Sequence, residues 1–254
     1  MALTTLLFVV IVPGAAFAAD AAAGGAASNS LSINLSGDGI FTDRLVQIIA
    51  LITVLSLAPS ILIMMTCFVR IVVVLSLLRT ALGVAQSPPN TVIVSLSLFL
   101  TFFVMTPTFH DAYVAGVEPL MQNKITTEEA LDRAAVPIKG FMLNHVRKAD
   151  LQLFIDMSHA RPPAKPSDIA ITTIAPAFML SELKRAFEIG FLIFVPFLVI
   201  DMAVASILMS MGMMMLPPVI ISLPFKLIFF VLVDGWRLVA GSLVESYMHG
   251  PPPG

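Results

Sequence analysis

Charged side chains inside long apolar segments are the residues of this chain whose chemistry stands out. Glu188 and Asp201 lie in the apolar stretch 187–216, and Lys226 lies in the apolar segment that follows it. Placing these charges in lipid costs free energy, so ionisable residues in such segments normally face a protein interior or a water-filled path. We therefore predict that Glu188, Asp201 and Lys226 are buried charges at a subunit interface.

Asp201 lies sixteen residues before a proline pair, Pro217 and Pro218, and Lys226 lies eight residues after it. An ion pair between them, within one subunit or between two, would offset part of the free energy that their desolvation costs. The alternative is that both side chains reach water at the edge of the apolar band by snorkelling. The spacing alone leaves both possibilities open.

A cluster of methionines directly precedes the proline pair. Its members are Met209, Met211, Met213, Met214 and Met215. Methionine is flexible and polarizable, so a ring of such side chains could seal a pore at rest and rearrange around different passing chains. Packing filler is the more ordinary role of methionine, but these residues lie beside Gly212 at an expected hairpin tip, where packing constraints are weakest. We interpret the cluster as a pore gasket.

Patterns that carry catalysis are absent from the sequence, which has no P-loop, no HExxH and no G-x-S-x-G motif. The histidines are scattered without ligand spacing, and the lone Cys67 excludes an intrachain disulfide and a cysteine zinc cluster. We predict no catalytic, cofactor or metal site, and we expect that the protein is not an enzyme. The net charge of −2 and the lack of any Lys/Arg run speak against nucleic acid as a partner.

The elements that position these residues must be membrane helices. The 254 residues are 58% hydrophobic and only 12% charged, and the mean hydropathy is +0.97. In ordinary soluble domains about a quarter of the residues are charged. We predict an all-α fold of membrane-associated helical hairpins with an inserted helical periplasmic domain.

The N-terminal apolar run, residues 6–12, is followed by an Ala-Phe-Ala site at residues 16–18 that suits signal peptidase. We predict a signal peptide over residues 1–18. No Lys or Arg precedes the run, and a retained first helix is the alternative. Residues 19–43 are rich in Ala, Gly and Ser, so we expect them to form a flexible exported segment.

The rest of the chain is expected to form a first apolar hairpin, a periplasmic domain, a second apolar hairpin with the methionine-rich loop, and a tail, at residues 44–106, 107–185, 186–248 and 249–254. The domain is placed by its composition, because it contains nine bases and nine acids. An exported N-terminus followed by a hairpin would leave this domain in the periplasm.

Prolines set the expected breaks of the first hairpin. An apolar helix over 45–69 should be kinked at Pro59, and a connector over 70–90 should follow it. The second helix, over 91–105, should end before Pro107 and is short for crossing a bilayer alone.

The domain sequence predicts helices. Thr126 and Glu129 form a capping box that should start one helix, and Pro137 and Gly140 should break it. Helical spacing then continues through about Met157.

A last helix should begin near Pro176 and run directly into the second apolar hairpin. Phe141 and Phe154 are the aromatic residues at the centre of the domain. They are either ordinary core residues or subunit contacts, with Glu182 adding a charge at the base of the domain.

Two long stretches of the sequence resemble the signatures of the FliP family of flagellar type III export-gate proteins. They are LRTALGVAQSPPN at 78–90 and GFLIFVPFLVIDMAVASILMSMGMMMLPP at 190–218, and the resemblance extends from about residue 40 to 248. It implies an oligomeric ring or helical gate of several copies in the bacterial inner membrane and flagellar basal body. It also implies FliQ, FliR and further export-apparatus membrane proteins as partners, unfolded export substrates as cargo, and membrane lipid around the assembly.

In that family a methionine-rich loop is thought to close the conduit, which points to Met213, Met214 and Met215, supported by Met209 and Met211. A virulence-type secretion homologue is the nearest alternative, and residues 1–40 favour the flagellar version by resemblance. A transporter of small solutes or ions is the alternative from a different class, with Asp201, Lys226 and Glu188 as a midplane relay.

Overall fold

The computed structural model describes residues 45–46, 48–50, 52–53, 56, 60–61, 63–84, 87–158, 168–213 and 216–248. The chain divides into two compact units, Met1–Ala50 and Leu51–Gly254. The described residues of the first unit are helical, and everything that follows concerns the second. The expected signal peptide, the segment 19–43, the kink at Pro59 and the tail 249–254 lie outside the described residues.

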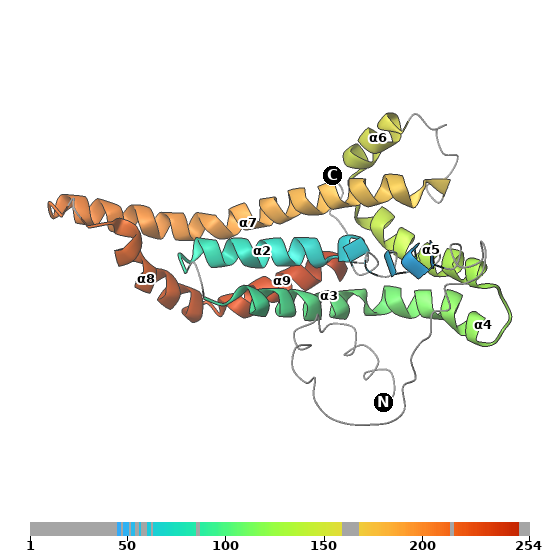
Figure 1. The fold of residues 1–254 in the computed structure, drawn as a ribbon. Helices are drawn as coiled ribbons and strands as arrows, with labels where there is room; N and C mark the ends of the chain where they lie inside the picture. Colours follow the sequence, from blue (N-terminus) through green and yellow to red (C-terminus); the bar gives the residue numbers. More distant parts are fainter. Residues whose placement is uncertain are drawn as a thin grey trace, which may run out of the picture. The chain divides into compact units, whose positions relative to one another are not determined.

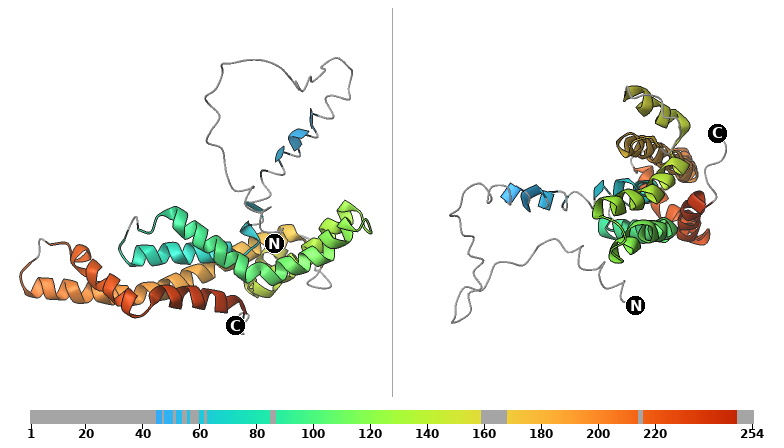
Figure 2. Two further views of the ribbon diagram at one scale, coloured as in Figure 1. Left: turned by 90° about the horizontal axis from the view of Figure 1, so that it is seen from below. Right: turned by 90° about the vertical axis from the view of Figure 1, so that its right-hand side faces the viewer.

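Every regular element in the described part of the second unit is helical. The elements are α2 (Phe68–Ala81), α3 (Asn90–Ala112), the π-helical turn η1 (Tyr113–Val117), α4 (Glu118–Met121), α5 (Thr127–His145), α6 (Lys148–Met157), α7 (Ile171–Ser210), α8 (Pro218–Leu232) and α9 (Gly235–Met248). In Figure 1 helix α7 runs along the top of the bundle and α3 along the bottom, with α2 and α9 at heights between them, while in Figure 2 α9 lies at an edge of the bundle. The prediction of an all-α fold is confirmed.

Two helical stretches in the described part of the chain are long and apolar enough to cross a membrane. They are Asn90–Met121, with 32 residues, and Ile171–Ser210, with 40 residues. Helices α8 and α9 meet at an angle of 61° and would give a third if they form one broken span. Forty residues of α-helix extend about 60 Å, so α7 is about twice as long as the hydrocarbon core is thick. These helices confirm that the protein is a membrane protein.

Two of the expected breaks are wrong. Helix α3 continues through Pro107 to Ala112, and α5 continues through Pro137 to His145. A proline removes only one backbone donor from a helix, and neighbouring groups can satisfy the carbonyl that it leaves. The second apolar segment is therefore not a short helix.

The expected connector over 70–90 is also wrong, because α2 occupies most of it. Arg70, at the start of the expected connector, lies buried in the first turns of α2. The apolar core lies mainly where α2 packs on α7 and includes Ile71, Val74 and Phe178. Gly190 of α7 faces Leu77 so closely that any side chain there would overlap it.

The helices of the expected domain begin and end partly as predicted. Thr126 caps α5 by accepting a hydrogen bond from the Glu129 amide, while the Glu129 carboxylate pairs with Arg133 at 2.6 Å. The predicted continuous helix through Met157 is interrupted, because Val146 and Arg147 are extended. Helix α7 runs without a break from the expected domain into the second hairpin, as predicted.

Candidate functional site

Asp201 and Lys226 meet where α7 packs against α8. The Lys226 ammonium lies 2.6 Å from Oδ2 of Asp201, and the Ser222 hydroxyl donates to Oδ1 at 2.5 Å. The Lys226 side chain is buried, and its ammonium also donates to the carbonyl of Ala81 at 3.3 Å. The ion pair considered from the spacing therefore forms within one chain, and Lys226 does not snorkel to water.

The position of Ala81 gives this ion pair a structural role. Ala81 is the last residue of α2, where backbone carbonyls lack helical partners and the helix carries partial negative charge. The Lys226 ammonium satisfies one of these carbonyls. The cluster of Asp201, Ser222 and Lys226 thus ties the hairpin of α7 and α8 to the end of α2.

Glu188 is not brought to this cluster. It lies on the same continuous helix as Asp201, thirteen residues earlier, which separates the two by about 20 Å along the axis. Its side chain is exposed in the single chain, and its expected place at a subunit interface stays a prediction. A relay of Glu188, Asp201 and Lys226 has no geometric basis in this fold.

The methionine cluster lies at the turn between α7 and α8. The turn is closed by Gly212, which has φ of +75°. The Gly212 amide donates to the Met209 carbonyl and the Met213 amide to the Leu208 carbonyl, at 3.1 and 3.0 Å. This is the Schellman pattern, in which a left-handed residue reverses the chain after a helix.

The described methionines at this turn are exposed, since Met209, Met211 and Met213 retain 57%, 65% and 40% of their accessible surface. Met214 and Met215 lie outside the described residues. Side chains this exposed do not fill the core of their own chain. Their role as a gasket stays a prediction.

Phe141 and Glu182 lie in the interior of the chain rather than on an exposed contact surface. Phe141 is buried, and its ring centroid lies 4.4 Å from that of His145 and 6.0 Å from that of Phe178. Glu182 is fully buried in α7. Phe154 of α6 is half-buried. The role of Phe141, Phe154 and Glu182 as subunit contacts stays a prediction.

A buried polar cluster around Glu182 was missed by the sequence analysis. Arg70 of α2 binds both carboxylate oxygens of Glu182, at 2.8 and 2.5 Å. Its third nitrogen donates to Ser246 at 3.2 Å, and its guanidinium lies 4.0 Å over the ring of Tyr247. The Tyr247 hydroxyl also donates to Glu182. The cluster joins α2, α7 and α9.

A second set of hydrogen bonds joins α6 and the residue before it to α7. Ser181 of α7 donates to Asp150 at 2.7 Å and accepts from the Arg147 amide at 3.1 Å. Ser181 directly precedes Glu182 in α7, which is why the two clusters adjoin. Among the described residues, no three His, Cys, Asp or Glu side chains lie close enough together to hold a metal ion.

Comparison with known proteins gives one consistent result. The model of the FliP family matches residues 51–243. The chain is 61% identical to the flagellar biosynthetic protein FliP of Caulobacter vibrioides, over 88% of this chain and 84% of that protein. It is 54% identical to the FliP protein of Bacillus subtilis, over 85% of this chain and 98% of that protein. It is 50% identical to the FliP protein of Aquifex aeolicus, over 83% of this chain and 89% of that protein.

Proposed function

We propose, from the premise that this chain belongs to the FliP family, that it is a core subunit of the flagellar type III protein export gate. Several copies would form a protein-conducting pore with FliQ and FliR in the bacterial inner membrane and flagellar basal body. Unfolded export substrates would pass through this pore, and flagellum assembly would require it. Residues 107–185 would lie on the periplasmic side.

The observation that carries this proposal is the turn between α7 and α8. Exposed methionines stand at a turn that Gly212 closes, and the ion pair of Asp201 and Lys226 fixes the hairpin to α2. A seal needs this combination of a rigid support and adaptable side chains. Methionine supplies the adaptable part, because its unbranched thioether chain fits gaps of many shapes.

Exposed apolar side chains support the proposal of an assembly in the membrane. Along α7, the side chains of Phe187, Phe191, Val199 and Met202 remain exposed in the single chain. Burying an apolar side chain contributes about 1.5–3 kcal/mol relative to leaving it in water. These side chains require lipid or neighbouring subunits around them.

The test is permeability of the assembled gate in vesicles. Replacing Met213, Met214 and Met215 by alanine should leave assembly intact and should leak ions or small molecules, because alanine is too short to fill the space. The matched control is Met202→Ala, which changes an exposed methionine of α7 away from the turn. Unchanged permeability in the triple variant would remove the gasket from the proposal. A chain that never forms a multi-copy complex would overturn the gate itself.

A further inference from the structure

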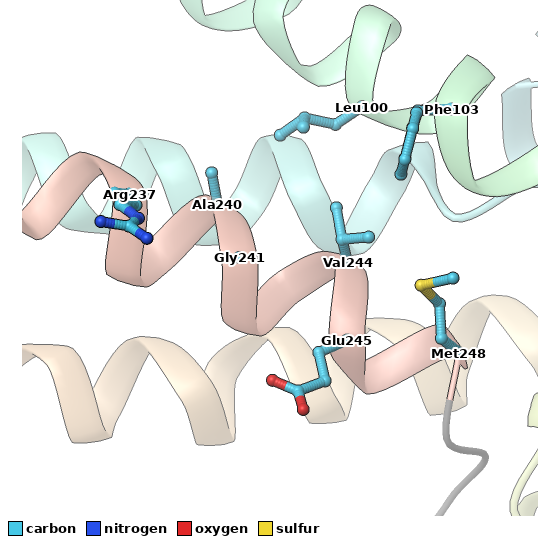
Figure 3. A pocket seen from close by; sticks show the side chains of 8 residues that line it. All are labelled: Leu100, Phe103, Arg237, Ala240, Gly241, Val244, Glu245 and Met248. Atoms are coloured by element: carbon cyan, nitrogen blue, oxygen red, sulfur yellow. The ribbon is translucent and has the colours of Figure 1, made fainter.

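An open apolar groove of about 540 Å³ lies between α3 and α9. Leu100 and Phe103 of α3 form one wall, and Val244 and the small residues Ala240 and Gly241 of α9 form the other (Figure 3). Small residues allow a neighbouring helix to approach closely, as helix interfaces in membranes require.

The groove also carries two opposite charges. Arg237 and Glu245 of α9 are both among its lining residues, eight positions apart (Figure 3). Arg237 is exposed and takes part in none of the ion pairs formed by the described residues. An arginine among membrane helices calls for an acidic partner or for water.

The exposed face of α7 carries the complementary charges. Lys184 and Glu188 are exposed one turn apart, on the side of α7 opposite to buried Ala186 and Gly190. Phe187 and Phe191 beside them retain 59% and 66% of their accessible surface. Neither Lys184 nor Glu188 joins an ion pair with another described residue.

The levels of these charges along the bundle can be compared, because Glu182 of α7 and Tyr247 of α9 are in contact. The two helices run in opposite directions (Figure 1). Counted from that contact, Lys184 and Glu245 both lie about 3 Å along the axis, toward the turn between α7 and α8. Glu188 lies about 9 Å and Arg237 about 15 Å in the same direction.

We propose that a second copy of this chain seats the exposed face of its α7 in the groove between α3 and α9. Glu188 of one copy pairs with Arg237 of the next, and Lys184 lies opposite Glu245. The inference rests on the multi-copy gate proposed above and names the surfaces that join its copies. The two surfaces differ, so the contact is head-to-tail and generates a ring or a helical assembly.

Charge reversal tests the pairing. Glu188→Arg and Arg237→Glu should each lower the amount of multi-copy complex on a native mass spectrum several-fold, because like charges then meet across the contact. Combining both reversals in one chain should restore most of the complex. Asp132→Lys, which reverses an exposed acid on α5, is the matched control and should leave the complex unchanged.

Cross-linking tests the geometry even where a reversal impairs folding. A chain carrying Glu188→Cys is co-expressed with a tagged chain carrying Arg237→Cys, both with Cys67→Ala, and treated with a short bis-maleimide. We expect a dimer band that contains both chains. Glu188→Cys with Asp132→Cys should give none.

The outcomes separate this inference from the proposed function. A multi-copy complex without the cross-link, in which both reversals are harmless, overturns this interface and leaves the gate proposal standing. Lipid that is retained in the groove of the intact complex would likewise overturn this interface and leave the gate proposal standing. A chain that is a monomer in every preparation overturns both.

Discussion

Arg70 and Glu182, which are 112 positions apart in the sequence, form a bidentate ion pair that is almost completely buried. Three helices meet there, since Arg70 belongs to α2, Glu182 to α7, and Tyr247 and Ser246 to α9. A buried charge is tolerated only when its partners satisfy it, and here each hydrogen-bonding group of the carboxylate has a donor. The cluster therefore holds α9 against the rest of the bundle.

Removing one partner of this ion pair should destabilise the protein strongly. Glu182→Gln leaves the Arg70 guanidinium buried without a counter-charge, which costs about 3–5 kcal/mol. We expect a large drop in the melting temperature of the detergent-solubilised protein. Glu129→Gln, which breaks the exposed pair with Arg133, should cost under about 1 kcal/mol and serves as the control. Equal effects of the two substitutions would contradict the buried cluster.

Reversing Lys226 should lower the yield of folded protein. In Lys226→Glu the new carboxylate faces Asp201 and the carbonyl of Ala81, so two acceptors lose their donor and like charges meet. The double variant Asp201→Lys with Lys226→Asp should recover part of the yield. Recovery stays incomplete because residue 226 still faces the Ala81 carbonyl. Yield is read by fluorescence-detected size exclusion.

The control for this reversal is Lys148→Glu, which changes an exposed lysine at the start of α6. It should leave the yield unchanged. A double variant that is no better than Lys226→Glu would mean that the pairing of Asp201 with Lys226 contributes little to the fold.

Gly212→Ala should disturb the turn between α7 and α8. Residue 212 has φ of +75°, a left-handed conformation that costs about 1 kcal/mol or more for a residue with a Cβ. We expect a lower melting temperature and, in vesicles, a leak like that of the methionine variants, because the exposed methionines lose their fixed support.

Gly140→Ala is the matched glycine control. Gly140 lies inside α5 with open space around it and no positive φ, so alanine there should stabilise the helix by up to about 1 kcal/mol. A Gly212→Ala variant as stable and as tightly sealed as the parent would show that the left-handed turn is unimportant.

Composition, local pattern and two long signature stretches determined much about this protein from the sequence. The apolar runs predicted an all-α membrane protein, the residues from Thr126 to Glu129 predicted a helix start, and the stretch at 190–218 indicated the FliP family. These features depend on neighbours in the chain. They are readable because a helix cap or an apolar stretch is defined within a few turns.

Only the tertiary structure decided which charges meet and which prolines end a helix. The pairing of Arg70 with Glu182 was not predicted, because the two residues are 112 positions apart and nothing local marks such a pair. Pro107 and Pro137 lie inside helices because packing of α3 and α5 against each other outweighs the loss of one backbone hydrogen bond. Glu188 and Asp201 look alike in the sequence, yet one is exposed and the other is paired, because each faces a different side of the same long helix.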